Sequence, residues 1–109
     1  MAVEKSLMTG SATMLILKLL SEKDMYGYEM IDTLRLRSQN VFELKAGTLY
    51  PILHGLEEKG WVTAYEQTHH KKIRKYYSIT KQGLRQLEEK KMEWEEYSKA
   101  VMNVLAMGV

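Results

Sequence analysis

Apolar residues in the segment TLYPILHGLEEKGW (48–61) recur at the spacing of an amphipathic helix. The stripe follows positions i, i+3, i+4 and i+7, which places its members on one side of a helix: Leu49, Ile52, Leu53 and Leu56. Pro51 and Gly55, two poor helix formers, lie off this stripe. The pattern predicts a helix over about residues 46–59, with Gly60 as its C-terminal cap and a shallow outer side.

Two more helices are predicted upstream of this one. The first covers residues 10–22, begins at a cap on Ser11 and is largely buried. A turn at residues 23–24 leads to the second, over residues 27–38, whose apolar face is formed by Met30, Ile31 and Leu34. The connection SQNVFELKAG follows, and its apolar residues anchor it to the core: Val41, Phe42 and Leu44.

The period of the pattern changes after Gly60. Residues 61–67 alternate between apolar and polar, and residues 73–79 are rich in β-branched and aromatic residues, so both are predicted strands. Residues 68–72 form the tip of the hairpin, without a two-residue turn of the Asn-Gly type. Thr80 then caps a last helix that extends to about Met107, roughly 40 Å long at 1.5 Å per residue.

The later half of the last helix carries an apolar stripe that the rest of the chain is too small to cover. A second copy of the chain would bury it, while Leu84 and Leu87 pack back on the parent domain. We therefore expect a mainly α chain with a small β-hairpin (α+β). Its architecture is a winged helix-turn-helix over residues 1–80, with a long C-terminal dimerisation helix over residues 81–109. The dimerisation stripe is Trp94, Tyr97, Val101, Val104 and Leu105.

Composition narrows the function classes. Apolar residues make up 45% of the 109 and charged residues 28%, which is typical of a globular chain. The absence of cysteine excludes disulfides, thiolate zinc sites and cysteine nucleophiles. The chain shows no apolar run of signal or membrane-spanning length, so cytoplasm is the expected compartment. The net charge of +2 is unevenly distributed, because residues 45–81 hold seven basic and three acidic residues.

The outer side of the helix over residues 46–59 could enter the major groove of DNA. Gly47 would let a phosphate approach, Thr48 and Tyr50 carry hydroxyls, and His54 can donate to a phosphate or a base edge. Any surface helix also has a polar outer side, so the helix alone does not decide between these interpretations. The hairpin tip is similarly ambiguous between phosphate contact and a solvated charged loop; its polar residues are His69, His70, Lys71, Lys72 and Arg74.

The sequence gives little support for a metal site or an enzyme active site. Adjacent histidines on a loop point apart, and no cysteine can complete a zinc site with His54, so we expect no metal and no other cofactor. The sequence contains no glycine-rich phosphate loop and no serine in a nucleophile elbow, so we expect no enzyme. Trp94 and Tyr97 are either plain interface core or the lining of an apolar cavity at the two-fold axis of the dimer, which would accept a flat aromatic effector.

Three segments in order resemble the short subgroup of the PadR family of transcriptional regulators, across about residues 7–106. MLILKLLSEKDMYGYEM resembles the family's first helix and the Tyr-Gly-Tyr-Glu start of its second. GTLYPILHGLEEKGWV resembles its recognition helix, and RKYYSITKQG resembles the second wing strand leading into the last helix.

The resemblance implies a homodimeric repressor that binds double-stranded DNA at an inverted repeat. In various members, phenolic acids, aromatic drugs or unknown signals release it. The resemblance matches Thr48, Tyr50 and Pro51 to the family's recognition-helix motif. It matches Tyr28 to a tyrosine that faces phosphate, and Trp94 to a tryptophan that stacks on ligands. Lys45 completes the candidate DNA contacts. The alternative is a winged helix that uses the same surfaces to bind proteins.

Overall fold

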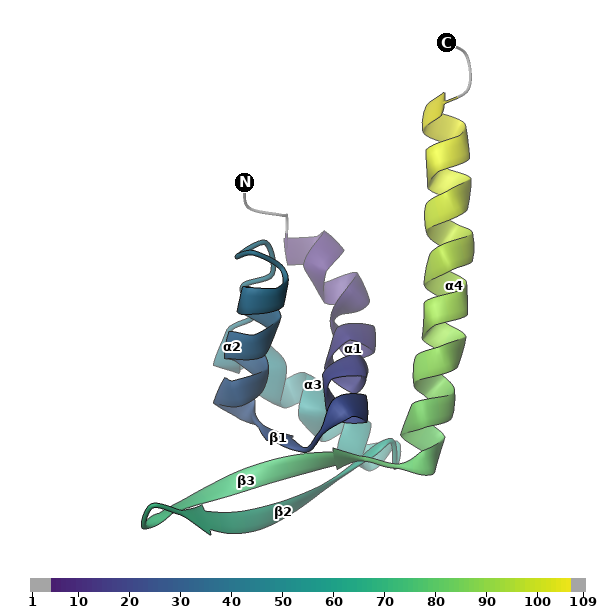
Figure 1. Ribbon diagram of the computed structural model, residues 1–109. Helices are drawn as coiled ribbons and strands as arrows, with labels where there is room; N and C mark the ends of the chain where they lie inside the picture. The colour runs from purple at the N-terminus through teal and green to yellow at the C-terminus, as the bar shows by residue number, and fades with distance from the viewer. Residues whose placement is uncertain (1–4, 107–109) are drawn as a thin grey trace.

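The computed structural model describes the backbone of residues 5–106 and the side chains of residues 10–106. Three helices gather over a small antiparallel sheet, and a fourth, longer helix stands beside them (Figure 1). The helices are α1 (Lys5–Glu22), α2 (Gly27–Arg37), α3 (Ala46–Glu58) and α4 (Lys81–Ala106). The strands are β1 (Met25–Tyr26), β2 (Val62–His69) and β3 (Lys72–Ile79), in the order β1-β3-β2. The predicted α+β winged helix is confirmed.

The core lies where the helices meet the inner face of the sheet. Leu49, Leu53 and Leu56 of α3 are almost completely buried, as the stripe predicts, whereas Ile52 is only partly buried. From the sheet, Val62 and Tyr77 join the same cluster. The helix ends as predicted, since Gly60 adopts the left-handed region at φ 76°, and the Trp61 N–H donates to the Leu56 carbonyl at 3.0 Å.

The predicted start of the first helix is wrong. The helix α1 begins at Lys5, so Ser11 lies inside it and is not its cap. Gly10 and Ser11 are weak helix formers that resemble a boundary in sequence, but the buried face continues through Ala12. Val41 is also more exposed than expected, at 37%, although Leu44 does anchor the connection.

The hairpin differs from its prediction at both ends. The strand β2 runs to His69 and β3 begins at Lys72, so the loop has only two residues. Both of them, His70 and Lys71, have positive φ values of 49° and 65°, the geometry of a tight hairpin turn. The strand β1, two residues paired with β3, is not marked by any pattern in the sequence.

The helix α4 begins as predicted, because the Thr80 hydroxyl accepts the Gly83 N–H at 3.0 Å. Leu87 is buried against the domain, but Leu84 is 43% exposed, so the prediction that it packs back is wrong. Met107 lies outside the described residues. Figure 1 shows α4 extending well past the other helices, in a molecule of 60 × 31 × 21 Å. No helix among residues 5–106 is long and apolar enough to cross a membrane.

Candidate nucleic-acid interface

The outer side of α3 is open and shallow. Gly47, Pro51 and His54 are exposed, and a Cβ placed on Gly47 or Gly55 would meet no atom within 4 Å. Since α3 begins at Ala46, Pro51 lies inside the helix and supplies no N–H to the Gly47 carbonyl. This surface therefore has room for a close partner and an exposed carbonyl that lacks its usual intrahelical donor.

Tyr50 has a different environment from its neighbours on α3. Its side chain is half-buried against the start of α2, where a Cβ on Gly27 would lie 2.3 Å from the Tyr50 hydroxyl oxygen. The glycine in the second helix is thus required by the close approach of the tyrosine ring. Tyr50 joins α3 to α2 through the hydroxyl end of its ring, and Thr48 is also partly buried.

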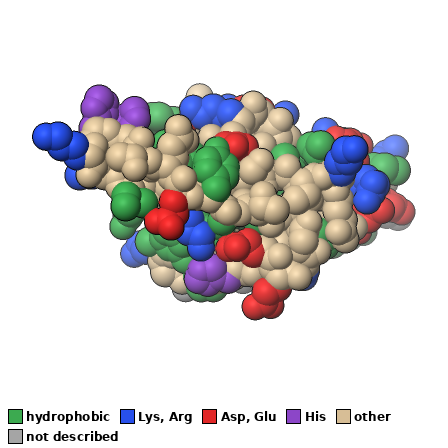
Figure 2. Space-filling model, turned by 90° about the horizontal axis from the view of Figure 1, so that it is seen from below, with side chains coloured by type: hydrophobic (Ala, Val, Ile, Leu, Met, Phe, Trp, Pro, Cys, Tyr) green, Lys and Arg blue, Asp and Glu red, His purple; other side chains and the backbone are tan. Residues whose placement is uncertain are grey.

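The hairpin tip forms an exposed cationic end of the molecule. His69, His70, Lys71 and Lys72 are all exposed, and the two imidazole rings meet edge to face at 4.2 Å between centroids. Figure 2 shows this cluster at one end of the lower face, with acidic side chains farther along. Tyr28, at the first turn of α2, is 62% exposed, and Lys45 is exposed directly before α3.

Arg74 does not extend freely from the wing, which is the hairpin of β2 and β3. Its guanidinium lies 4.3 Å from the centre of the Tyr26 ring in a cation–π contact. The Tyr26 ring meets Tyr76 edge to face, and Tyr76 stacks on Tyr65 at 5.8 Å. This ladder, defined by Tyr26, Tyr76 and Tyr65, crosses the outer face of the sheet. In the sequence these three tyrosines lie far apart, and the register of the three strands brings them together in the ladder.

Two contacts fix the wing relative to the helices. The Tyr65 hydroxyl donates to Asp24 Oδ2 at 2.6 Å, and this hydrogen bond raises the pKa of Tyr65 above its usual value. On the inner face, Lys75 Nζ lies 3.7 Å from Glu57 Oε1 of α3. The hairpin of β2 and β3 is therefore connected to α3 by an exposed ion pair and to the turn before β1 by a hydrogen bond.

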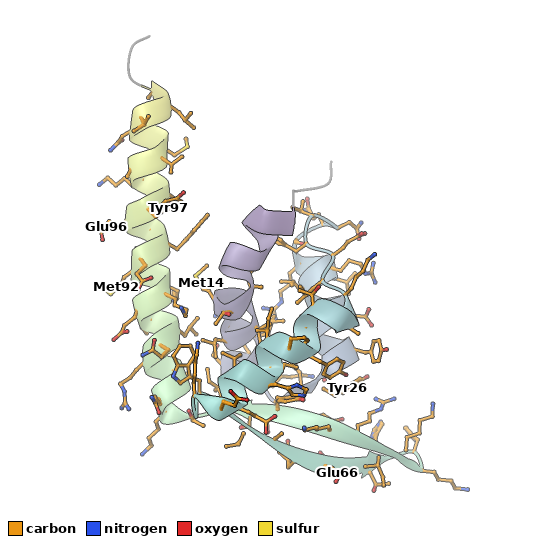
Figure 3. All side chains as sticks on the ribbon, turned by 180° about the vertical axis from the view of Figure 1, so that it is seen from behind. Met14, Tyr26, Glu66, Met92, Glu96 and Tyr97 are labelled. Carbon is orange, nitrogen blue, oxygen red and sulfur yellow. The ribbon has the colours of Figure 1, made fainter. Side chains whose placement is uncertain are left out.

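The later half of α4 leaves a row of apolar side chains exposed. Trp94 is 50% exposed and Val101 38%, and the remaining members are exposed by about two thirds or more: Tyr97, Val104 and Leu105. Figure 3 shows Met14 and Tyr97 on the facing sides of α1 and α4, with Met92 and Glu96 on the outer side of α4. An open cavity of about 620 Å³ lies between the two helices, lined in part by Met14, Lys90, Glu93, Trp94 and Tyr97.

The part of the chain that the structure describes contains no group of three or more His, Asp or Glu residues able to hold a metal ion. The histidine of α3, His54, and the two at the hairpin tip lie on separate elements. The site is a surface of exposed cations and open backbone.

Comparison with known proteins identifies the family. A family model described as "Transcriptional regulator PadR-like family" matches residues 16–89, which covers α1 to the first part of α4. The chain belongs to the PadR family. A relative from Lysinibacillus sphaericus, called uncharacterized protein X, is 36% identical over 100 residues, covering 91% of this chain and 92% of the relative. The transcriptional regulator YqjI of Escherichia coli is 33% identical over 86 residues, 79% of this chain but only 40% of that protein.

Solved structures of other transcriptional regulators have a similar fold. A transcriptional regulator from Clostridium thermocellum matches with a TM-score of 0.85 and 32% identity, over 95% of this chain and 98% of that chain. A PadR family transcriptional regulator from Eggerthella lenta also gives 0.85 and 32%, over 94% and 88%. The chain is thus a PadR-family transcriptional regulator with a winged helix DNA-binding fold, and its relatives are regulators rather than enzymes.

Proposed function

We propose that this PadR-family chain acts in the cytoplasm as a homodimeric repressor that binds an inverted-repeat operator. The outer side of α3, from Gly47 to His54, would lie in the major groove of each half-site. The cationic tip formed by residues 69–72 would meet the neighbouring phosphates. The observation that carries the proposal is that an open α3 surface and the exposed basic tip of the β2–β3 hairpin occur in one domain, with Lys75 of β3 paired to Glu57 of α3.

The remaining candidates contribute at the edges of this surface. Tyr28 and Lys45 are exposed at the starts of α2 and α3, where their polar ends can reach phosphate. Thr48, which is partly buried, would act through its hydroxyl, and Tyr50 would act by holding α3 against α2, because its hydroxyl lies beside Gly27. Arg74 would act mainly by bracing the wing through Tyr26, because its guanidinium is already engaged there.

The dimer would form through the later half of α4. Residues 94, 97, 101, 104 and 105 form one exposed apolar stripe, and isolated surface stripes of this kind mark interaction sites. Two copies of α4 packed along this stripe would bury it and fix the separation of the two recognition helices. An inverted repeat is the operator symmetry that such a two-fold dimer requires.

An aromatic effector would act at the α1–α4 cavity. Trp94 and Tyr97 provide aromatic surface there, and their ring centroids are 6.5 Å apart. A planar ligand that fits only one arrangement of the dimer would change the spacing of the α3 helices and release the operator. Such a ligand can shift the equilibrium only by its difference in affinity for the two arrangements.

DNA binding is tested by a salt titration of the wild type and the Lys71→Ala/Lys72→Ala variant. The variant should bind every duplex more weakly, and its plot of log affinity against log salt should be flatter by up to about 0.9 for each phosphate that is no longer neutralised. Lys18→Ala is the matched control, since Lys18 is exposed but pairs with Glu22 on α1. Equal affinity and slope in all three proteins would remove the hairpin tip from the DNA contact. No salt-dependent duplex binding by any of them would favour the alternative, a winged helix that binds proteins.

The cavity is tested by tryptophan fluorescence. Titration with planar aromatic dyes should quench the wild-type emission, and the Trp94→Phe variant should lose that part of the quenching which saturates. An intact dimer that shows no quenching across a diverse aromatic panel would leave Trp94 as interface core only.

A further inference from the structure

Trp61 occupies the junction between the recognition helix and the dimerisation helix. It directly follows the end of α3, where its N–H donates to the Leu56 carbonyl at 3.0 Å. Its own carbonyl accepts the N–H of Thr80, the residue that caps α4, at 3.0 Å. The Thr80 hydroxyl donates to the Gly60 carbonyl at 2.8 Å, with the Trp61 carbonyl 3.0 Å away. The end of α3 and the start of α4 are therefore bonded to the same residue.

The first turn of α4 is also in direct steric contact with this junction. A Cβ on Gly83 would lie 2.2 Å from the Trp61 carbonyl oxygen, so only glycine lets α4 approach so closely. A shift of the first turn of α4 must therefore move Trp61 or break these bonds. Because Trp61 continues directly from α3, such a shift also changes the end of the recognition helix.

Two lysine ammonium groups lie over the indole ring of Trp61. Lys59, the residue directly after α3, places its Nζ 4.7 Å from the ring centroid. Lys90, from the third turn of α4, places its Nζ 5.6 Å from the same centroid. Lys90 also lines the 620 Å³ cavity, together with Glu93 and Trp94. Lys90 therefore both lines this cavity and places its ammonium group against the Trp61 ring.

We propose that Lys90 couples occupancy of the α1–α4 cavity to the placement of the recognition helix, through the indole of Trp61. A ligand in the cavity competes with the indole for the Lys90 side chain. When Lys90 leaves the indole, Trp61 loses one of its two cation–π partners and the tie between α4 and the end of α3 weakens. This inference rests on the proposed function, in which a ligand in that cavity weakens operator binding.

The size of the effect follows from the cation–π geometry. A cation–π pair at an exposed site corresponds to about a two- to fivefold change in an equilibrium constant. Removal of the Lys90 ammonium from the indole should therefore change operator affinity, and the ligand's effect on it, by about that factor. A positioning residue of this kind changes the coupling between the two sites and leaves each site able to bind.

The absence of cysteine from the chain allows a defined occupant to be used as the probe. Thr13 lines the cavity from α1, so a Thr13→Cys protein labelled with N-phenylmaleimide carries one aromatic ring tethered in it. Operator affinity of the labelled and unlabelled dimers is measured in four backgrounds: native Lys90, Lys90→Met, Lys90→Arg and Lys91→Met. Lys91 is the matched control, because it is the neighbouring lysine and pairs with Glu88 at 3.6 Å.

We expect labelling to weaken operator binding when residue 90 is lysine or arginine and in Lys91→Met. In Lys90→Met the labelled and unlabelled dimers should bind within experimental error of each other. Equal weakening in all four backgrounds would overturn the role of Lys90 while the effector switch stands. No weakening in any background would overturn both the coupling and the proposed effector switch.

A spectroscopic readout separates coupling from a general loss of stability. In a Trp94→Phe background Trp61 is the sole tryptophan, and its emission reports on the ammonium groups beside it. Labelling should shift that emission when Lys90 is present and leave it unchanged in Lys90→Met. An identical shift in both proteins would contradict the proposal, because the ring would then reach Trp61 without Lys90.

Discussion

Substitution of Gly83 by alanine should destabilise the protein more than its position in a helix suggests. The added Cβ would lie 2.2 Å from the Trp61 carbonyl oxygen and 2.7 Å from Ile79 Cγ1, where ordinary contact begins at 3.4 Å. The first turn of α4 would have to move by about 1 Å, which strains the hydrogen bond from the Thr80 N–H to that carbonyl and the contacts of the Thr80 hydroxyl with the Gly60 and Trp61 carbonyls.

The expected cost combines overpacking and weakened hydrogen bonds, together about 3 kcal/mol. Alanine is better than glycine in a helix by about 1 kcal/mol, so the net loss should be about 2 kcal/mol. For a chain of this size that corresponds to a melting temperature roughly 10 °C lower. Thermal unfolding followed by circular dichroism, at one fixed protein concentration, measures it.

Gly55→Ala is the matched control for Gly83→Ala. Gly55 also lies in a helix, but its Cβ would meet nothing within 4 Å, so this variant should gain up to about 1 kcal/mol. The two substitutions are chemically identical and should shift the melting temperature in opposite directions. A Gly83→Ala protein as stable as the wild type would refute the close approach of α4 to Trp61.

Other contacts in the molecule support three more predictions. The Arg37 guanidinium lowers the pKa of Glu22 from 4.5 to about 2, so this pair stabilises the fold above about pH 4.5 and the stability is lost as the pH falls toward 2. Arg37→Gln should therefore show a smaller loss of stability across that range in urea titrations; an unchanged loss would mean that the pair is open in solution. Val104→Asp should yield monomers in sedimentation equilibrium and Asn103→Asp, on the opposite side of α4, should not; dimers in both would exclude the apolar stripe as the interface. Gly47→Ala should raise the melting temperature slightly but weaken operator binding, since its methyl group would occupy the groove-facing side of α3; unchanged binding would remove that side from the DNA contact.

Periodicity predicted the elements that bury a continuous face. The stripe from Leu49 to Leu56 is long enough to define both the helix and its buried side, and Thr80 and Gly60 have the local chemistry of helix caps. The family-level function was also accessible, because several motifs occur in order along the chain. Each of these features depends on a short segment of the chain, so the sequence of that segment was sufficient to predict it.

Features that depend on tertiary contacts could not be predicted from the sequence. The two residues of β1 are a strand only because Met25 pairs with Tyr77, and no local pattern marks them. His70 and Lys71 form a tight turn in a conformation that glycine or asparagine usually signals. Likewise, Lys59 and Lys90 flank Trp61 from two different helices, and their separation in sequence hides that contact.

The central claim is that two copies of this chain read one symmetric operator. Genomic fragments bound by the intact protein at physiological salt, recovered and sequenced, test it most directly. We expect enrichment of an inverted repeat whose half-sites are separated by about one or more whole turns of DNA. Recovered fragments without any repeated half-site, or with affinity independent of sequence, would contradict it.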